Sequence, residues 1–393
     1  MEMYRPTWAE IDLDNILHNY NAVKSFIRDG TKVCAIIKAN AYAHGSVEVA
    51  KHLEKNGCDY FGVATLNEAL ELRNNGIKQR IMCLSYIDPS AYPLAIKNDI
   101  DIPLFSYEVA QKVSKIAKEL GSYANIQIKL DTGMSRVGFA YEDKTVEEIE
   151  KIGKLENLIL QGIYTHFAMA DTTDRTVTDE QFERYRDIVD RLEEKGIYFK
   201  IHHACNSAGI MSYPEYHMDM VRLGISLYGH YPSEEVDKSI LDLRPAMTLK
   251  SQLTNVKTVQ KGTGISYGHT YHSSEEELVG TIPIGYADGF TRLLSGKANV
   301  MINEKLYPIV GRICMDQSMV RVDKDAKIGD EVIIFGPKKG IEFEQLASKL
   351  GTINYELLCM VQRRIPRVYF VDGKEVKTVN YLLDQAIRTK DER

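Results

Sequence analysis

Residues 32–45 read KVCAIIKANAYAHG, an apolar run that stops at Lys38 and is followed by small and aromatic residues. An ammonium group taken out of water must be paired or lose its proton. A desolvated lysine is also the group that forms a Schiff base with a carbonyl cofactor or substrate. The alternative is a strand-end lysine whose long stem reaches solvent. The stretch therefore predicts a strand that ends at a lysine, and the rest of the chain decides between these two interpretations.

This stretch is the first of several β-rich runs that alternate with amphipathic helical segments. The runs lie at residues 32–39, 60–65, 80–85, 101–106, 125–131, 158–167, 198–207 and 220–229. Eight strand-and-helix units of this kind favour a TIM-like (β/α)8 barrel. A doubly wound open sheet is the rival fold, but the chain lacks its Gly-x-Gly-x-x-Gly segment.

The pattern changes near Pro245, where short alternating strands and turn residues replace the strand-and-helix units. We therefore expect an α/β plus all-β protein, with a (β/α)8 barrel over residues 1–244 and a mainly β-strand domain over residues 245–393. The strands expected in the second domain are 253–259, 277–282, 298–302, 305–310, 319–322 and 331–335. A helix is expected over 344–350 and a polar helical tail over 380–393.

Composition excludes several classes of protein. With 44% hydrophobic and 26% charged residues, the chain has the make-up of an ordinary globular protein. A net charge of -6 with interspersed signs provides no basic stripe for nucleic acid or for an anionic membrane. No apolar run reaches the length of about 20 residues that spans a bilayer, and the N-terminus lacks a signal-peptide pattern. We expect a cytoplasmic protein.

The cysteines and histidines give no metal pattern. The six cysteines are scattered, without Cys-x-x-Cys or zinc spacing, and read as reduced core residues. His202 and His203 are adjacent, and neighbouring residues on a strand face opposite ways. No metal site is therefore expected.

Ionisable and hydroxyl side chains gather where the predicted barrel strands end. In barrel enzymes, catalytic groups occupy the C-terminal ends of the strands. The residues at these positions are Lys38, Lys129, Asp131, Arg136, His166, Ser207 and Arg222. A solvated loop face could collect such residues by chance, but so many strand ends pointing into one mouth favour an active site.

The loops after the last two predicted strands are suited to a phosphate group. Ser207 offers a hydroxyl, and Gly224 and Ile225 offer backbone N–H groups in a turn of small residues. Barrel enzymes often bind phosphate at these two loops. The segment around Ser207 could instead be an ordinary helix cap. A phosphate cradle together with a Schiff-base lysine points to pyridoxal 5′-phosphate.

Arg222 indicates how such a cofactor would be used. An arginine is always charged and only donates hydrogen bonds, so beside the pyridine nitrogen it leaves that nitrogen unprotonated. Negative charge at the substrate Cα is then spread less into the ring, which disfavours transamination and requires well-placed bases at Cα. Alternatively, Arg222 has a structural role as the partner in a salt bridge.

Six segments, in order along the chain, resemble motifs of the alanine racemase family. They are residues 37–45, 130–138, 264–268, 284–289, 311–317 and 352–356. The visible departure is Ala43, where the family usually has glycine. This difference matters only if the position needs a positive φ.

The resemblance implies two bases on opposite faces of the substrate, as racemisation requires. Lys38 would hold the cofactor and act on the D face of alanine. Tyr267, from the second domain of the partner subunit, would act on the L face. His166, hydrogen-bonded to Arg222, would lie close to that tyrosine.

The resemblance also assigns the remaining site residues. The phosphate would be held by Tyr42, Ser207, Tyr355 and the amides of Gly224 and Ile225. The substrate carboxylate would be bound by Arg136 and the partner's Met315 amide. In many relatives the lysine at Lys129 is carbamylated and orients that arginine. The narrow substrate corridor would be lined by Tyr286, Asp171 and Arg312.

The function implied is pyridoxal-phosphate-dependent interconversion of L-alanine and D-alanine by a homodimer with composite sites, supplying D-alanine for peptidoglycan. A serine racemase of the same family is the nearest alternative. A non-catalytic pyridoxal-phosphate-binding protein would stop after the barrel, and related decarboxylases use a carboxylate at the ring nitrogen, which Arg222 argues against.

Overall fold

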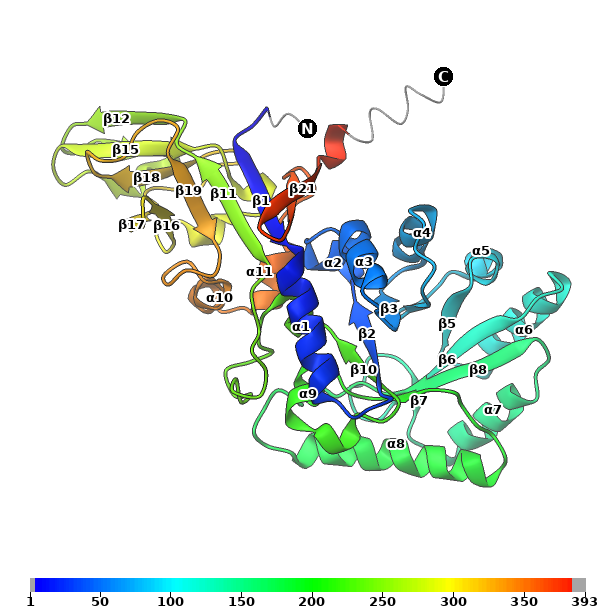
Figure 1. Cartoon of the computed structure of the whole chain (residues 1–393). Helices are drawn as coiled ribbons and strands as arrows, with labels where there is room; N and C mark the ends of the chain where they lie inside the picture. The colour runs from blue at the N-terminus through cyan, green and yellow to red at the C-terminus, as the bar shows by residue number, and fades with distance from the viewer. Residues whose placement is uncertain (1–3, 384–393) are drawn as a thin grey trace, which may run out of the picture. The chain divides into compact units, whose positions relative to one another are not determined.

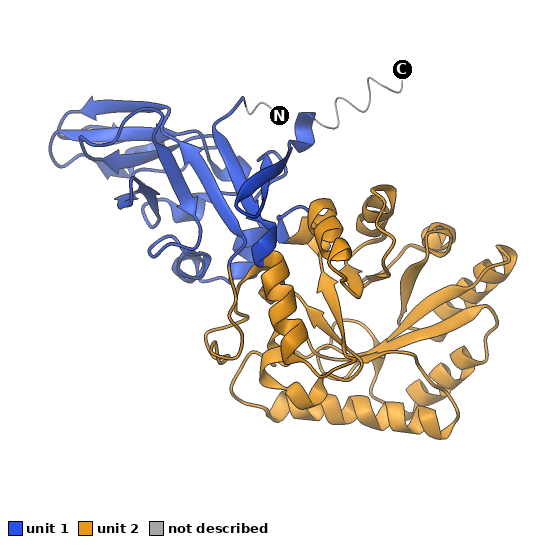
Figure 2. Ribbon diagram, viewed as in Figure 1, with its two compact units in different colours: residues 1–15, 42–45, 245–393 blue, residues 16–41, 46–244 orange. Residues whose placement is uncertain are grey.

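The computed structural model describes residues 4–383, which fold into two compact units. One unit comprises residues 16–41 and 46–244 and is called the barrel unit. The other comprises the described residues within 1–15, 42–45 and 245–393 and is called the strand-rich unit (Figure 2). No helix among residues 4–383 is long and apolar enough to cross a membrane.

The barrel unit is built on a nearly closed ring of eight parallel strands (Figure 1). In spatial order they are β10 (Met220–Leu223), β2 (Lys32–Ile36), β3 (Tyr60–Val63), β4 (Ile81–Cys83), β5 (Ile100–Leu104), β6 (Ala124–Asp131), β8 (Leu158–Tyr164) and β9 (His202–His203). Between β9 and β10, the amide of Asp219 donates to His202 O (3.1 Å) and that of Arg222 to Cys205 O (3.0 Å). The predicted (β/α)8 barrel is therefore confirmed.

The helices of this unit pack an apolar stripe on strands that are buried along almost their whole length, as parallel strands covered on both faces are. They are α1 (Leu13–Phe26), α3 (Ser46–Lys55), α4 (Leu66–Asn74), α5 (Tyr92–Lys97), α6 (Tyr107–Glu119), α7 (Asp143–Gly153), α8 (Thr176–Glu194) and α9 (Ser207–Ser212). Thr65 and Glu68 form a capping box that starts α4 directly after β3. A short β7 (Phe139–Ala140) pairs with the end of β6.

The described residues of the strand-rich unit form three sheets. The largest has the order β17 (Lys305–Pro308), β16 (Asn299–Ile302), β19 (Glu331–Phe335), β11 (Met247–Gln252), β1 (Thr7–Asp12), β20 (Arg367–Val371) and β21 (Lys374–Val379). The second joins β12 (Asn255–Val259), β15 (Glu277–Ile282) and β18 (Ser318–Val322), and the third pairs β13 (Gly264–Ile265) with β14 (Tyr271–His272). The helices α10 (Phe343–Leu350) and α11 (Asn354–Cys359) also belong to this unit.

The N-terminal strand differs from the expected division of the chain at residue 245. That division assigned residues 1–244 to the barrel, whereas β1 pairs antiparallel with β11 and parallel with β20 inside the strand-rich unit. Its alternating burial, one face in and one face partly out, suits a strand of that sheet. Most of the helical tail expected over 380–393 lies outside the described residues.

Candidate active site

Lys38 begins a left-handed turn directly after β2. The turn is α2 (Lys38–Tyr42), in which Ala39, Asn40 and Ala41 all have φ and ψ between 45° and 56°. Tyr42 and Ala43 continue it with φ of 49° and 67°. A left-handed conformation costs about 1–2 kcal/mol for each residue with a Cβ. Five such residues in succession persist only where their surroundings hold them, which is common at functional sites.

Hydrogen bonds hold this turn from both of its ends. In the barrel unit, the Ala39 amide donates to Glu68 Oε1 (2.6 Å) and the Asn40 side chain accepts from the Ser46 amide (3.1 Å). In the strand-rich unit, the buried Arg367 donates from Nε to Ala43 O (2.9 Å). The Ala43 position does take a positive φ, so the departure from the family glycine carries backbone strain.

Arg222 lies buried in β10 with its guanidinium between two histidines. Nη1 lies 2.7 Å from His203 Nδ1, and Nη2 lies 3.0 Å from His166 Nδ1. Both arms also donate to backbone carbonyls, those of Thr165, His203 and Ala204. These partners of Arg222 within the described part of the chain are imidazoles and backbone carbonyls, and none of them is a carboxylate.

The charge state of the two histidines follows from this arrangement. An arginine only donates, so both Nδ1 atoms must accept. Burial, followed by the Arg222 charge, lowers the pKa of His166 and of His203 well below its ordinary value. Both rings are therefore neutral and carry their proton on Nε2.

Lys129 lies in β6 with its amine inside the barrel. Nζ donates to Leu130 O (2.7 Å) and lies 5.3 Å from the centre of the Tyr164 ring. Burial, aided by the positive charges of Arg222 and Arg136 and opposed by Asp131, lowers the pKa of Lys129 to about 7. A large share of this amine is therefore neutral near pH 7.

Asp131, at the end of β6, organises the loop that carries Arg136. Its carboxylate accepts from the amides of Gly133 (3.1 Å), Ser135 (2.9 Å) and Arg136 (2.9 Å). The Arg136 side chain remains exposed. The Asp131 carboxylate therefore fixes the shape of this loop, while the Arg136 guanidinium is accessible to a ligand.

Ser207 lies against the loop that follows β10. Ser207 is the first residue of α9, whose cap is Asn206, accepting from the Gly209 amide at 2.9 Å. Ser207 Oγ accepts from the amides of Gly224 (2.9 Å) and Ser226 (3.4 Å). Asp171 belongs to the loop after β8, and its carbonyl accepts from Ser233 Oγ.

Tyr42 and Tyr355 are the two predicted phosphate-binding tyrosines, and both belong to the strand-rich unit. Their ring centres lie 6.2 Å apart with tilted planes. Burial, with a smaller contribution from Tyr355, raises the pKa of Tyr42, so its hydroxyl remains protonated and able to donate.

Four predicted site residues form a cluster in the strand-rich unit, here called the Tyr267 cluster. Its members are Tyr267, Tyr286, Arg312 and Met315. Their loops are joined by hydrogen bonds from the Tyr286 amide to Cys314 O (3.0 Å) and from Ser266 Oγ to Arg312 O (2.6 Å). Tyr267 is 71% exposed and Met315 53%. Gly268 takes a φ of 67°, which favours glycine, and a Cβ there would lie 2.7 Å from Arg312 Nη1.

His203 and Gln127 are polar groups at this site that the sequence reasoning missed. The His203 ring stacks on Tyr164, with centroids 4.8 Å apart and planes within 4°, and touches Arg222. In the sequence, the adjacency of His202 and His203 suggests a metal pair and gives no role to His203 alone. The alternation of side chains along a strand could have revealed this role, because it turns one of the two histidine rings into the barrel.

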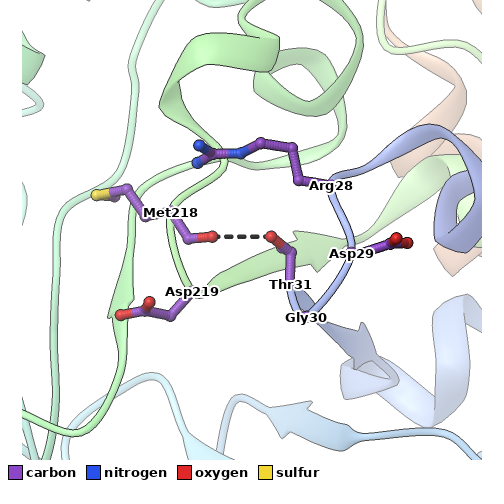
Figure 3. Close-up of a pocket in the computed structure, with 6 residues that line it drawn as sticks. All are labelled: Arg28, Asp29, Gly30, Thr31, Met218 and Asp219. Carbon is purple, nitrogen blue, oxygen red and sulfur yellow. Dashed lines mark hydrogen bonds between the residues drawn. The ribbon is translucent and has the colours of Figure 1, made fainter.

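A pocket at the opposite end of the barrel does not coincide with these residues. It is lined by Arg28, Asp29, Gly30, Thr31, Met218 and Asp219, which precede β2 and β10 (Figure 3). Thr31 Oγ1 donates to Met218 O (2.9 Å) across it. Lys38 and Arg222 lie toward the carboxyl ends of the same two strands, where barrel enzymes carry their chemistry.

Both halves of the chain match known proteins. The family model for the alanine racemase N-terminal domain matches residues 11–232, and that for the C-terminal domain matches residues 246–369. An alanine racemase from Clostridium tetani is 45% identical over 383 residues, covering 96% of this chain and 99% of the relative. One from Methanococcus maripaludis is 48% identical over 369 residues, covering 93% and 98%.

Solved structures agree with these matches. The structure of alanine racemase from Clostridium difficile 630 aligns with a TM-score of 0.95 at 48% identity, covering 97% of this chain and 100% of that one. An alanine racemase from Bacillus anthracis with bound L-Ala-P aligns with a TM-score of 0.93 at 37% identity, covering 98% and 100%.

Proposed function

The chain belongs to the alanine racemase family and is an isomerase, and we propose that it interconverts L-alanine and D-alanine with pyridoxal 5′-phosphate held at Lys38. The observation that carries this proposal is Arg222, a buried guanidinium flanked by two neutral histidines with no carboxylate among those hydrogen-bond partners. Such a group suits a cofactor ring whose nitrogen stays unprotonated.

The residues on the barrel rim fit this cofactor. Ser207 Oγ and the Gly224 amide already meet at 2.9 Å, so a hydroxyl and loop amides are gathered in one place for a phosphate. Lys38 follows β2 and Arg222 lies in β10, and these strands are neighbours in the barrel. Tyr42 and Tyr355 would supply further hydroxyl donors to the phosphate.

The cofactor, when bound, withdraws electrons from the substrate Cα and so makes its hydrogen acidic. The chain's own groups would then move the proton. Lys38 would remove or return it on one face and Tyr267 on the other, since racemisation needs bases on both sides. Arg136 would bind the substrate carboxylate with the Met315 amide, and Tyr286, Asp171 and Arg312 would restrict the corridor to small side chains.

We further propose a homodimer with composite sites. Tyr267 and Met315 are largely exposed, as residues that act in the site of a partner subunit would be in a single chain. The D-alanine formed would serve peptidoglycan synthesis, and the enzyme would work in the cytoplasm.

Lys129 is proposed to carry a carbamate that orients Arg136. An amine whose pKa lies near 7 supplies the neutral form that reacts with carbon dioxide. Protein prepared with ¹³C-labelled bicarbonate should show a carbonyl signal that is absent from Lys129→Gln. Identical spectra for the two proteins would contradict the carbamate but not the racemase.

The decisive test is circular dichroism of L-alanine incubated with purified, cofactor-loaded protein, with L-serine in parallel. We expect the alanine signal to decay to zero with no loss of amino acid. A decay confined to serine would identify a serine racemase. No decay of either signal in the loaded protein would overturn the proposal and favour a non-catalytic binding protein.

A further inference from the structure

A chain of buried polar groups runs from Arg222 through the interior of the barrel. His203 Nε2 lies 3.3 Å from Gln127 Oε1, and Gln127 Nε2 lies 2.7 Å from Asp101 Oδ2. Tyr60 donates its hydroxyl to the same Asp101 oxygen. Asp101, Gln127 and His203 are fully buried. Arg80 Nη2 approaches the other Asp101 oxygen at 3.8 Å.

The direction of every bond in this chain is fixed by its two ends. Arg222 only donates, so His203 Nδ1 accepts and the proton of this neutral ring is on Nε2. That proton must be donated to Gln127 Oε1, which leaves the Gln127 amide hydrogens for Asp101. Asp101 Oδ2 accepts from Gln127 and Tyr60, and its other oxygen faces Arg80. Burial raises the pKa of Asp101, and these three neighbours oppose that shift.

The barrel is shaped to hold Gln127 in this orientation. Gly162 of β8 lies opposite Gln127 in the strand register. A Cβ at this glycine would lie 2.1 Å from Gln127 Oε1 and 2.9 Å from its Cδ. The stack of His203 on Tyr164 fixes the ring plane as well. The side chain of Gln127 therefore has a dedicated space.

We propose that Gln127 and Asp101 are positioning residues for Arg222, acting through the tautomer of His203. Asp101 orients the Gln127 amide, Gln127 accepts the His203 Nε2 proton, and the bare Nδ1 then faces the guanidinium. Without this acceptor, the tautomer that Arg222 needs would bury an unsatisfied N–H group. That the guanidinium must be placed for a cofactor ring rests on the function proposed above.

The first test reads the tautomer directly and does not depend on racemase activity. Full-length protein with ¹⁵N-labelled histidine, with and without pyridoxal phosphate, should show one bare and one protonated nitrogen for His203. The signals are assigned by their loss in His203→Gln. In Gln127→Met and in Gly162→Ala, which displaces the Gln127 amide, we expect this pattern to be lost or averaged.

The matched control is Asn125→Leu, which removes a part-buried hydrogen bond to Asp99 from the same strand outside the chain of groups. It should leave the His203 signals unchanged. An unaltered His203 pattern in both Gln127→Met and Gly162→Ala would overturn the proposal, whether or not the protein racemises alanine.

The second test measures the consequence at the cofactor. In Gln127→Met and Asp101→Asn, the visible absorption of the bound cofactor should shift, and kcat for alanine should fall about tenfold with KM little changed, as loss of one buried acceptor suggests. A purely structural role would lower the melting temperature without moving the absorption band, and that result would contradict the proposal. If the wild-type protein is inactive but the absorption band still shifts in the variants, the proposed racemase activity is wrong and the positioning role of Gln127 and Asp101 stands.

Discussion

At the scale of single residues, the barrel interior controls protonation through burial. Lys129 and the two histidines beside Arg222 all lose affinity for protons, because burial in each case is the largest effect and neighbouring positive charge adds to it. Burying these groups costs folding free energy, and proteins accept that cost at sites where a neutral amine or imidazole takes part in chemistry.

Lys129 should therefore make stability depend on pH in a defined direction. Its pKa is about 7 in the folded protein and 10.5 when unfolded, so the unfolded chain binds more protons between these values. The free energy of unfolding should rise with pH across this window by linkage. In Lys129→Gln the rise should be smaller, as urea unfolding at pH 7, 8 and 9 would measure.

The exposed Lys112→Gln is the control for that series, because its removal from the surface of α6 leaves the buried amine in place. It should keep the wild-type slope. Equal slopes for wild type and Lys129→Gln, both prepared without bicarbonate so that no carbamate forms, would show that the amine is not desolvated in solution.

Tyr267 offers a second prediction at this scale. Tyr267→Phe removes the proposed base on one face and should lower kcat at least about 100-fold, the usual size for general acid–base catalysis. Cofactor binding, read from visible absorption, should be retained. Tyr198→Phe, another exposed tyrosine, should have no effect. Full activity in Tyr267→Phe would exclude the two-base mechanism.

At the scale of elements, the left-handed turn after β2 is the least expected feature. Nothing in residues 39–43 except the asparagine favours a positive φ. The turn is held by partners distant in sequence, among them Glu68 and Arg367. Local sequence could not reveal it, because tertiary contacts overrule the local preference.

Ala43→Gly should stabilise the protein. Relief of a left-handed alanine gains about 1–2 kcal/mol, and the added freedom of the unfolded chain costs about 0.4–1 kcal/mol. The free energy of unfolding should rise by the difference. Ala22→Gly, in helix α1, is the matched control and should lose about 1 kcal/mol. A loss at both positions would mean that residue 43 is not left-handed in solution.

At the scale of the whole molecule, the proposed site needs residues from both units. Lys38 belongs to the barrel unit and Tyr267 to the strand-rich unit. If each site takes them from different subunits, two inactive variants can complement each other. Such complementation tests whether each site is shared between two subunits, which no single variant can show.

Co-expressed Lys38→Ala and Tyr267→Phe chains should form mixed dimers in which one of the two sites is intact. Random assembly of a two-fold dimer would restore about a quarter of wild-type activity. Each variant purified alone should be inactive, and activity should follow the mixed species through tandem affinity tags. Absence of any recovery in purified mixed dimers would mean that both residues act within one chain.

Much of the barrel was predictable because its signal is local. The β-rich runs are short, apolar and regularly spaced, and each of the eight overlaps an observed strand of the ring. β1 was not predicted, since Thr7–Asp12 becomes a strand only by pairing with β11 and β20, far along the chain. Predicted residues such as Lys129, His166 and Arg222 do meet, because parallel strands gather their carboxyl ends at one rim.

The eight-stranded barrel, the mainly β remainder and the ionisable groups at the strand ends could be predicted, because hydrophobic periodicity and residue chemistry are local properties of the chain. Three features emerge only in the folded protein: the left-handed turn at Lys38, the tautomers around Arg222, and the Gln127–Asp101 chain of groups behind His203. These depend on which distant side chains meet in a dry interior, where burial alters proton affinity and every donor needs an acceptor.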